Sequence, residues 1–371
     1  MPTSTLPTVG QVVAARGATS GFDYLRIGLA VAVVAIHSWR VTVGPDAMED
    51  VATPFAALIN LILPLFFGLS GFLVAGSLER VRDLRVFLTF RALRIFPALT
   101  VEVVLSALVL GPLLTSAALG AYFADPLFAR YLANAAGIVS FQLPGVFAAN
   151  PTTEVNGALW TVPYELECYL LLAGLALLTV VRRPPLLLGV VLLWGAYLTA
   201  STLLDFGGAD GGFGVTVAGA ETARVRVSQL LVPSFLAGVT LFVWRDRMPF
   251  GPAWIAGSGA LALLCLTSPL FYGFAPLPAA YLAAGLGLQT PRKSALLRSG
   301  DYSYGIYLYA YPVQQAVWQL APGGQTYLGN LVLSLLFVSL FAAFSWHGIE
   351  KPALRLKTVF FGRKPLQSRP A

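Results

Sequence analysis

Two ionisable side chains, Arg26 and His37, lie in the first apolar stretch of the sequence, where a charge inside a membrane is costly. They are eleven residues apart, so on a helix they share almost the same face, about 16 Å apart along the axis. A buried imidazole can act as a general base that takes the proton from a hydroxyl group. The alternatives are that Arg26 is an interfacial anchor and that His37 makes an interhelical hydrogen bond.

A carboxylate in a later apolar stretch could support that base. Glu165 lies about 12 Å below the outer end of its predicted helix, and His37 lies about 9 Å below the outer end of its own. A carboxylate–imidazole pair would orient the ring and stabilise the imidazolium. Pro163 would interrupt the helix and open space for a substrate. The alternative is that Glu165 and Glu167 form a polar patch facing an external loop, and their spacing lets at most one of them face His37.

Arginines are concentrated between residues 80 and 94. Arg91 and Arg94 are three residues apart, so they share one face of a predicted short helix that stops at Phe96–Pro97. Two neighbouring guanidinium groups suit a diphosphate. The alternative is that these arginines only fix the orientation of the chain in the membrane.

The composition places these residues in a membrane protein. Of the 371 residues, 57% are hydrophobic and only 11% are charged, whereas soluble domains carry about 25% charged residues. The net charge of +7 comes from short basic clusters between apolar runs, which favours membrane orientation over nucleic-acid binding. Cys168 and Cys265 lie in apolar stretches and provide neither a disulfide framework nor metal-ligand spacing. We expect no metal site and no nucleic-acid partner.

Ten stretches are close to the length of about 20 residues that crosses a bilayer. They are residues 23–43, 54–78, 97–118, 157–181, 185–204, 226–244, 252–268, 270–290, 302–320 and 326–347. Counting 127–143 as an eleventh span would place every later basic cluster on the outer side, so ten spans with cytoplasmic ends are predicted. Residues 119–156 then form an external loop that partly enters the membrane.

The predicted fold is therefore an all-α, polytopic membrane helix bundle. We expect a cytoplasmic tail at residues 1–22, one transmembrane domain at 23–350 and a second cytoplasmic tail at 351–371.

Six motifs together resemble the membrane acyltransferase-3 family, in the family's order and over residues 21–355. They are Phe22-Asp-Tyr-Leu-Arg26 with His37, Phe66-Phe67-Gly68-Leu-Ser70-Gly71-Phe72-Leu73, Arg91-x-x-Arg94-Ile-Phe-Pro97, Leu159-Trp160-Thr-x-Pro-x-Glu165, Ser303-Tyr304-Gly-Ile-Tyr307-Leu and Glu350-Lys351-Pro352. The resemblance implies transfer of an acyl group, often acetyl, from cytoplasmic acyl-CoA to a hydroxyl. The implied acceptors are sugars of surface polysaccharides, lipid-linked glycans or secreted small molecules.

The resemblance also implies residue roles. His37 would be the catalytic histidine, supported by Glu165, and it would activate the acceptor for direct attack or carry the acyl group briefly. The CoA phosphates would be bound by Arg26, Arg91 and Arg94. We expect substrate contacts from Trp160, Tyr164, Ser303 and Tyr304. Aromatic side chains that could stack on a sugar ring are Trp160, Tyr122, Tyr131 and Phe147.

Two other function classes fit part of the sequence. A proton-coupled transporter or flippase could also use a buried His37–Glu165 pair. It explains neither the Arg91/Arg94 spacing nor the order of the motifs, and the sequence shows no inverted repeat. A non-catalytic membrane scaffold would leave both buried groups as unexplained costs. The expected partners are acyl-CoA, a carbohydrate or other hydroxyl acceptor and membrane lipids, and the expected location is a bacterial cytoplasmic (inner) membrane.

Overall fold

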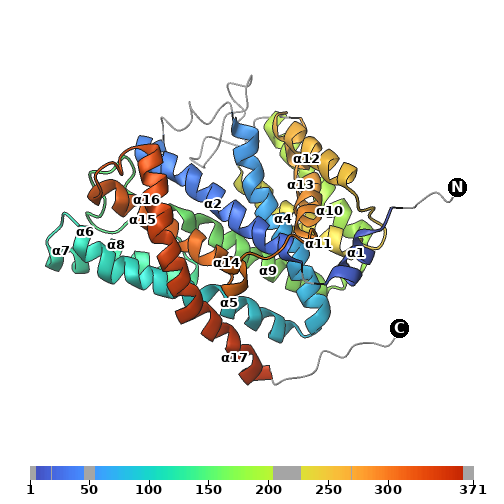
Figure 1. Cartoon of the computed structure of the whole chain (residues 1–371), viewed down its shortest axis with the longest axis horizontal. Helices are drawn as coiled ribbons and strands as arrows, with labels where there is room; N and C mark the ends of the chain where they lie inside the picture. The colour runs from blue at the N-terminus through green and yellow to red at the C-terminus, as the bar shows by residue number, and fades with distance from the viewer. Residues whose placement is uncertain (1–5, 18, 46–54, 204–226, 269, 362–371) are drawn as a thin grey trace.

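The computed structural model describes residues 6–17, 19–45, 55–203, 227–268 and 270–361. Within these ranges the regular elements are all helices, and the only extended pairings are two isolated bridges, Thr8 with Pro249 and Thr115 with Val146. Figure 1 shows the helices packed side by side in a single bundle. The all-α prediction is confirmed.

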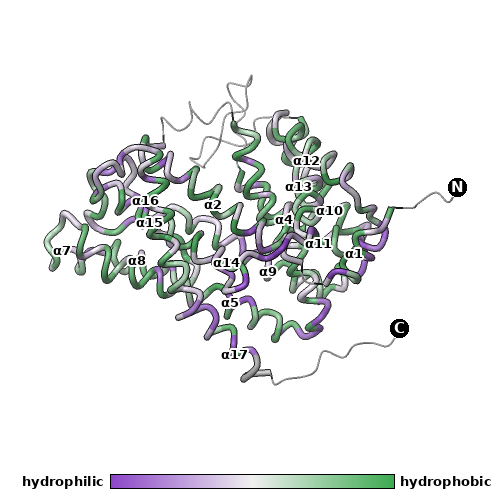
Figure 2. The backbone as a smooth tube through the Cα atoms, viewed as in Figure 1, coloured by the Kyte–Doolittle hydropathy of each residue, from purple (hydrophilic) through white to green (hydrophobic). Residues whose placement is uncertain are grey.

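Five helices among the described residues are long and apolar enough to cross a membrane. They are α2 (Ser20–Val43), α4 (Ala56–Val81), a continuous helix over Leu84–Leu114, α10 (Pro184–Leu203) and a helix over Tyr327–Lys357. Figure 2 shows that the bundle is largely hydrophobic, with hydrophilic residues gathered at turns such as the one between α4 and α5. The chain is an integral membrane protein.

Five further helices lie at predicted spans; four of them have 12 to 16 residues and the fifth has 18. They are α9 (Val162–Leu177), α11 (Ser228–Val243), α12 (Pro252–Leu266), α13 (Pro276–Gly287) and α15 (Ser303–Leu320). A 3₁₀ turn, η6 (Tyr272–Phe274), separates α12 from α13. Residues 127–143 form no span, because the chain there makes only α8 (Pro126–Leu132), η3 (Ala133–Ala136) and irregular backbone.

The predicted helix stop at Phe96–Pro97 is wrong. Pro97 lies inside α5 (Leu84–Leu105), which continues through a π-helical turn, η2 (Ser106–Leu110), into α6 (Gly111–Leu114). A proline removes one backbone hydrogen bond, but ending the helix in a bilayer would leave several polar groups without water. Arg91 and Arg94 therefore sit on a helix that runs on into the core of the bundle.

The closest helix packing joins α4 and α11 through glycines. A Cβ atom on Gly71 would lie 2.0 Å from the carbonyl oxygen of Phe235, and one on Gly238 would lie 2.0 Å from the carbonyl oxygen of Gly68. Small residues allow such close approach of membrane helices. This contact fixes the wall that α4 contributes to the site.

The two predicted tails are partly helical. The first contains α1 (Val9–Arg16), and the second contains α17 (Lys351–Phe361), which continues the helix α16 (Tyr327–Phe344) through a π-helical turn, η7 (Ser345–Glu350). Residues 1–5 and 362–371 of these tails, and part of the predicted span 226–244 at residue 226, lie outside the described residues.

Candidate active site

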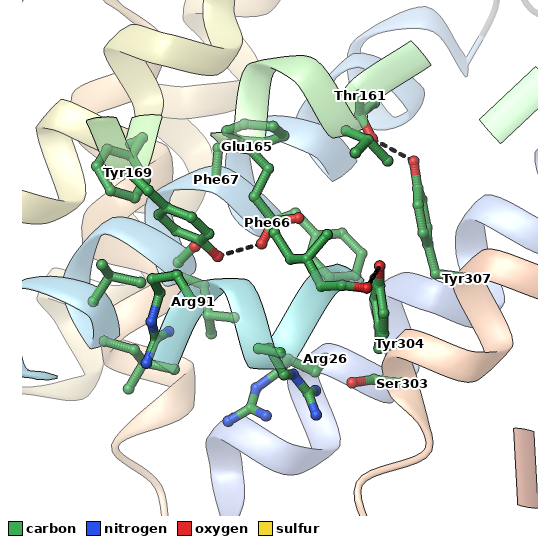
Figure 3. Close-up of a pocket in the computed structure, with 18 of the residues that line it drawn as sticks. Arg26, Phe66, Phe67, Arg91, Thr161, Glu165, Tyr169, Ser303, Tyr304 and Tyr307 are labelled. Carbon is green, nitrogen blue, oxygen red and sulfur yellow. Dashed lines mark hydrogen bonds between the residues drawn. The ribbon is translucent and has the colours of Figure 1, made fainter. Parts of the chain in front are cut away.

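A cavity of about 390 Å³ lies between α2, α4, α5, α9 and α15 (Figure 3). Six of the nine predicted site residues line it: Arg26, Arg91, Arg94, Glu165, Ser303 and Tyr304. His37, Trp160 and Tyr164 do not line it. Figure 3 shows Arg26 and Arg91 along the lower side of the cavity, with Thr161 and Tyr307 at the upper right. The cavity thus has a basic end and an end closed by tyrosine and threonine.

At the basic end, two of the arginines share one carboxylate. Arg26 Nη1 lies 2.7 Å from Asp301 Oδ2, and Arg94 Nη2 lies 2.8 Å from the same oxygen. Arg94 Nη1 also pairs with Glu350 Oε2 at 3.1 Å. Burial alone would raise the pKa of Asp301, but Arg94 and Arg26 lower it to about 2, so this carboxylate is ionised at neutral pH. Sequence reasoning missed the role of Asp301, although it lies only two residues before the Ser303–Tyr304 motif.

Arg91 has a different environment. Its guanidinium group lies 5.9 Å from the ring centre of Phe87 and 5.8 Å from that of Tyr169, and its only described hydrogen bond is a long one, 3.4 Å from Nη2 to Ser77 Oγ. Its Nε is buried without a hydrogen-bond partner, and no ion pair to Arg91 is found among the described residues. Among the described residues, Arg91 therefore has more unused hydrogen-bonding capacity than Arg26 and Arg94, the two cavity-lining arginines that hold Asp301.

Glu165 lies along the cavity between these two ends. Its carboxylate accepts a hydrogen bond from the hydroxyl of Tyr169, one helical turn further along α9 (Figure 3). Glu167, two residues on, is exposed and does not line the cavity. Glu165 therefore faces the cavity and Glu167 does not, whereas the expectation concerned which of them faces His37. Pro163 lies in the first turn of α9, where the preceding 3₁₀ segment η4 (Gly157–Thr161) ends.

The other end of the cavity is closed by Tyr307. Its hydroxyl donates to the carbonyl oxygen of Ala158 at 2.6 Å and lies 2.5 Å from Thr161 Oγ1. Tyr307 also packs with Val41 and Tyr311 in a small apolar cluster beyond the cavity. A hydrogen-bonded tyrosine therefore separates the cavity from the next layer of side chains.

His37 lies in that next layer. Its ring meets the ring of Tyr311 edge to face, with 5.1 Å between centroids and 75° between planes. Its Nδ1 is buried and has no hydrogen-bond partner in the described part of the chain. Tyr311 donates its hydroxyl to Glu154 Oε2 at 2.6 Å, and Glu154 pairs with Arg40. The structure gives no hydrogen bond or ion pair between His37 and Glu165 in the described part of the chain; the carboxylate beside His37 is Glu154.

The four residues predicted to contact the substrate have partners within the protein. Ser303 Oγ donates to Asp301 Oδ1 at 2.6 Å, and the Tyr304 hydroxyl donates to the carbonyl oxygen of Ile95 at 3.1 Å. The rings of Trp160 and Tyr164 pack together, with centroids 5.8 Å apart.

The expectation that Tyr122, Tyr131 and Phe147 could stack on a sugar is wrong, because all three side chains are completely buried. All three belong to the main apolar core of the bundle.

The family of the chain follows from comparison with known proteins. Residues 19–347 match the family model for the acyltransferase-3 acyltransferase domain. The chain belongs to the acyltransferase-3 family. It is 28% identical to "Nodulation protein 10" of Rhizobium leguminosarum bv. viciae over 375 residues, covering 94% of this chain and 96% of that protein. It is 24% identical to the "O-acetyl transferase" of Shigella phage Sf6 over 341 residues, covering 89% and 94%. No solved structure matches it.

The family and the helices together establish a membrane O-acyltransferase. Among the described residues no group of three or more histidine, cysteine, aspartate or glutamate side chains is arranged to hold a metal ion. The cavity is lined by arginines, tyrosines and Glu165, and His37 lies beyond it, against the ring of Tyr311.

Proposed function

We propose that this acyltransferase moves an acyl group, most simply acetyl, from cytoplasmic acyl-CoA to a hydroxyl acceptor. The acceptor is a carbohydrate, a lipid-linked sugar or a secreted small molecule, and His37 is the catalytic base. The observation that carries the proposal is the cavity itself, which runs from Arg26, Arg91 and Arg94 to Tyr307, next to the layer that contains His37.

The orientation of the chain is part of the proposal. Ten spans with both ends in the cytoplasm, with tails at 1–22 and 351–371 around a domain at 23–350, place the basic end of the cavity at the inner face. His37 then lies in the outer half of the bundle, about 16 Å from Arg26 along α2. The similarity to proteins of a bacterium and a bacterial phage supports a bacterial cytoplasmic membrane as the location.

The basic end suits a polyanionic donor. Within the described residues, Arg91 has a buried Nε without a hydrogen-bond partner and no carboxylate bound, so its planar fork can take phosphate oxygens. Arg26 and Arg94 already hold Asp301, and a donor phosphate would compete with that carboxylate for the same guanidinium groups. Phe66, Phe67 and Leu63 of α4 line the cavity and provide an apolar path for the thioester arm.

The proposed transfer begins when His37 takes the proton of the acceptor hydroxyl. The hydroxyl oxygen forms a bond to the thioester carbonyl carbon, and the carbon–sulfur bond breaks. The CoA thiolate leaves and takes the proton from the imidazolium, which returns His37 to its neutral form. For the thioester to reach His37, the Tyr307 side chain that closes the cavity has to move aside.

Membranes that contain the protein should transfer label from acetyl-CoA radiolabelled in the acetyl group into a glycan or lipid fraction. Matched membranes without the protein are the control. Label that accumulates inside sealed vesicles without any chemical modification of an acceptor would contradict the proposal and favour the transporter.

A further inference from the structure

Glu154 is the acidic side chain that accompanies His37, and nothing in the motifs points to it. It lies in the loop that leads to η4, outside the cavity that the arginines and Glu165 line. Its Oε2 accepts the hydroxyl hydrogen bond of Tyr311 at 2.6 Å. The same Tyr311 ring packs against the His37 ring, so one tyrosine touches both the histidine and the carboxylate.

The carboxylate is held from several sides. Arg40 donates to both of its oxygens, from Nη2 to Oε1 at 2.9 Å and from Nε to Oε2 at 3.3 Å. The backbone carbonyl of Glu154 accepts from Gln315 Nε2 at 2.6 Å. A Cβ atom on Gly157 would lie 2.7 Å from Tyr311 Cζ and 2.8 Å from Glu154 Oε2, so glycine leaves room for the contact.

The charged groups around His37 sum to zero while His37 is neutral, and they no longer do so once His37 is protonated. The charged side chains that act on it are Arg40, one turn along the same helix, and Glu154 from the loop. The titratable groups on α15 that face this layer are Tyr307 and Tyr311. While His37 is neutral, the Arg40–Glu154 pair has no net charge. Once His37 holds a proton, Glu154 is the anion beside it that can offset the added charge.

We propose that Glu154, connected through Tyr311, is the positioning residue of His37, and that Glu165 serves the donor cavity instead. This rests on the proposed function. During the step in which the hydroxyl proton moves to His37 and the oxygen–carbon bond forms, the fixed carboxylate stabilises the imidazolium. When the carbon–sulfur bond breaks, the thiolate takes that proton from the imidazolium, and the charge on Glu154 is unchanged throughout.

The test compares Tyr311→Phe and Glu154→Gln with the unmodified full-length protein, using acetyl-CoA and the acceptor fraction that becomes labelled. Tyr311→Phe keeps the ring against His37 and removes the hydroxyl. We expect kcat to fall about tenfold to 100-fold, the size expected for one hydrogen bond to a charged group. The KM for acetyl-CoA should not change, because the donor binds at the basic end. Tyr309→Phe is the matched control, since the Tyr309 hydroxyl is buried on the same helix and has no hydrogen-bond partner among the residues that the structure describes.

The pH dependence separates a charge effect from a packing effect. Without the anion, the imidazolium is less stable, so the acidic limb of the kcat–pH profile should move to lower pH in Glu154→Gln. A kcat and a profile equal to those of the unmodified protein in both variants would overturn the inference. If Glu154→Gln fails to accumulate because Arg40 loses its carboxylate, the double variant Arg40→Gln/Glu154→Gln removes both charges. Normal kcat in that double variant would overturn the inference equally.

The proposed function fails separately from this inference. An active His37→Ala variant would contradict the role of the histidine itself. An inactive His37→Ala variant together with fully active Tyr311→Phe and Glu154→Gln variants would leave the histidine in place and remove only its assigned partner.

Discussion

Arg26 and Arg94, which come from two different helices, hold the same carboxylate oxygen, Oδ2 of Asp301, at 2.7 and 2.8 Å. The carboxylate thus joins α2 and α5 to the start of α15 at the basic end of the cavity. It also places an anion where the proposed donor phosphates bind. The ion pairs explain how two arginines can lie close together beside an apolar cavity without repelling each other.

Removal of this carboxylate should destabilise the bundle. Asp301→Asn leaves two partly buried guanidinium groups without their shared partner, and we expect a loss of about 1–3 kcal/mol, discounted from the fully buried case because these side chains are partly exposed. The loss would appear as a lower thermal unfolding temperature of the purified protein in detergent.

The effect of Asp301 should also depend on pH. Its pKa is lowered from 3.8 to about 2 in the folded protein, so its stabilising contribution is complete above about pH 4 and is lost as the pH falls towards 2. The difference in unfolding temperature between the unmodified protein and Asp301→Asn should therefore be constant from pH 7 to 5 and shrink below pH 4. A difference that grows on acidification would contradict the ion-pair assignment.

Arg91 should determine affinity for the donor. Arg91→Lys keeps a positive charge but loses the planar fork, and we expect the KM for acetyl-CoA to rise about tenfold. Arg85→Lys is the matched control, because Arg85 is on the same helix, exposed and outside the cavity. Equal KM values for the two variants would show that the fork of Arg91 does not bind the donor.

Glu165 and Glu167 offer a second matched pair. Glu165 lines the donor cavity and bonds to Tyr169, whereas Glu167 is exposed. Glu165→Gln should therefore change the KM for acetyl-CoA, with a smaller effect on kcat than Glu154→Gln, and Glu167→Gln should change neither. The prediction fails if Glu165→Gln lowers kcat at unchanged KM, since that result would indicate that Glu165 supports His37 in catalysis and does not serve donor binding.

The close packing of α4 on α11 should tolerate no added methyl group. Gly71→Ala would place a Cβ atom 2.0 Å from a backbone oxygen, so we expect a loss of about 1–3 kcal/mol from overpacking. Gly189→Ala in α10 is the control, because nothing lies within 4 Å of the added atom. Unfolding temperatures of the two variants in detergent give the comparison, and equal values would mean that the helices can separate freely.

Much of the fold could be predicted because hydropathy marks where a chain can enter a bilayer. The predicted stretches 54–78, 185–204 and 302–320 correspond to α4, α10 and α15 within a few residues. The course of the chain at Pro97 could not be predicted, because a proline usually stops a helix in water but not in lipid. Helix lengths also fell short where 3₁₀ turns interrupt an apolar run.

The site could be predicted one residue at a time, but its contacts could not. Spacing along a helix gives the depth of His37 and Glu165, but not which neighbouring helix each side chain faces. Glu154 joins His37 only because its loop folds back against Tyr311, and Asp301 joins Arg26 and Arg94 only because three helices meet there. These are tertiary relationships that no local spacing contains.

The central claim is that His37 is the base of acyl transfer, and the most direct measurement is transfer of radiolabel from acetyl-CoA by membranes that contain equal amounts of each variant. His37→Ala should show no transfer above the level of membranes without the protein. The other histidine, His347, lies next to Tyr302 and outside the cavity. The His347→Ala variant should therefore retain transfer. Transfer by His37→Ala at the rate of the unmodified protein would contradict the mechanism.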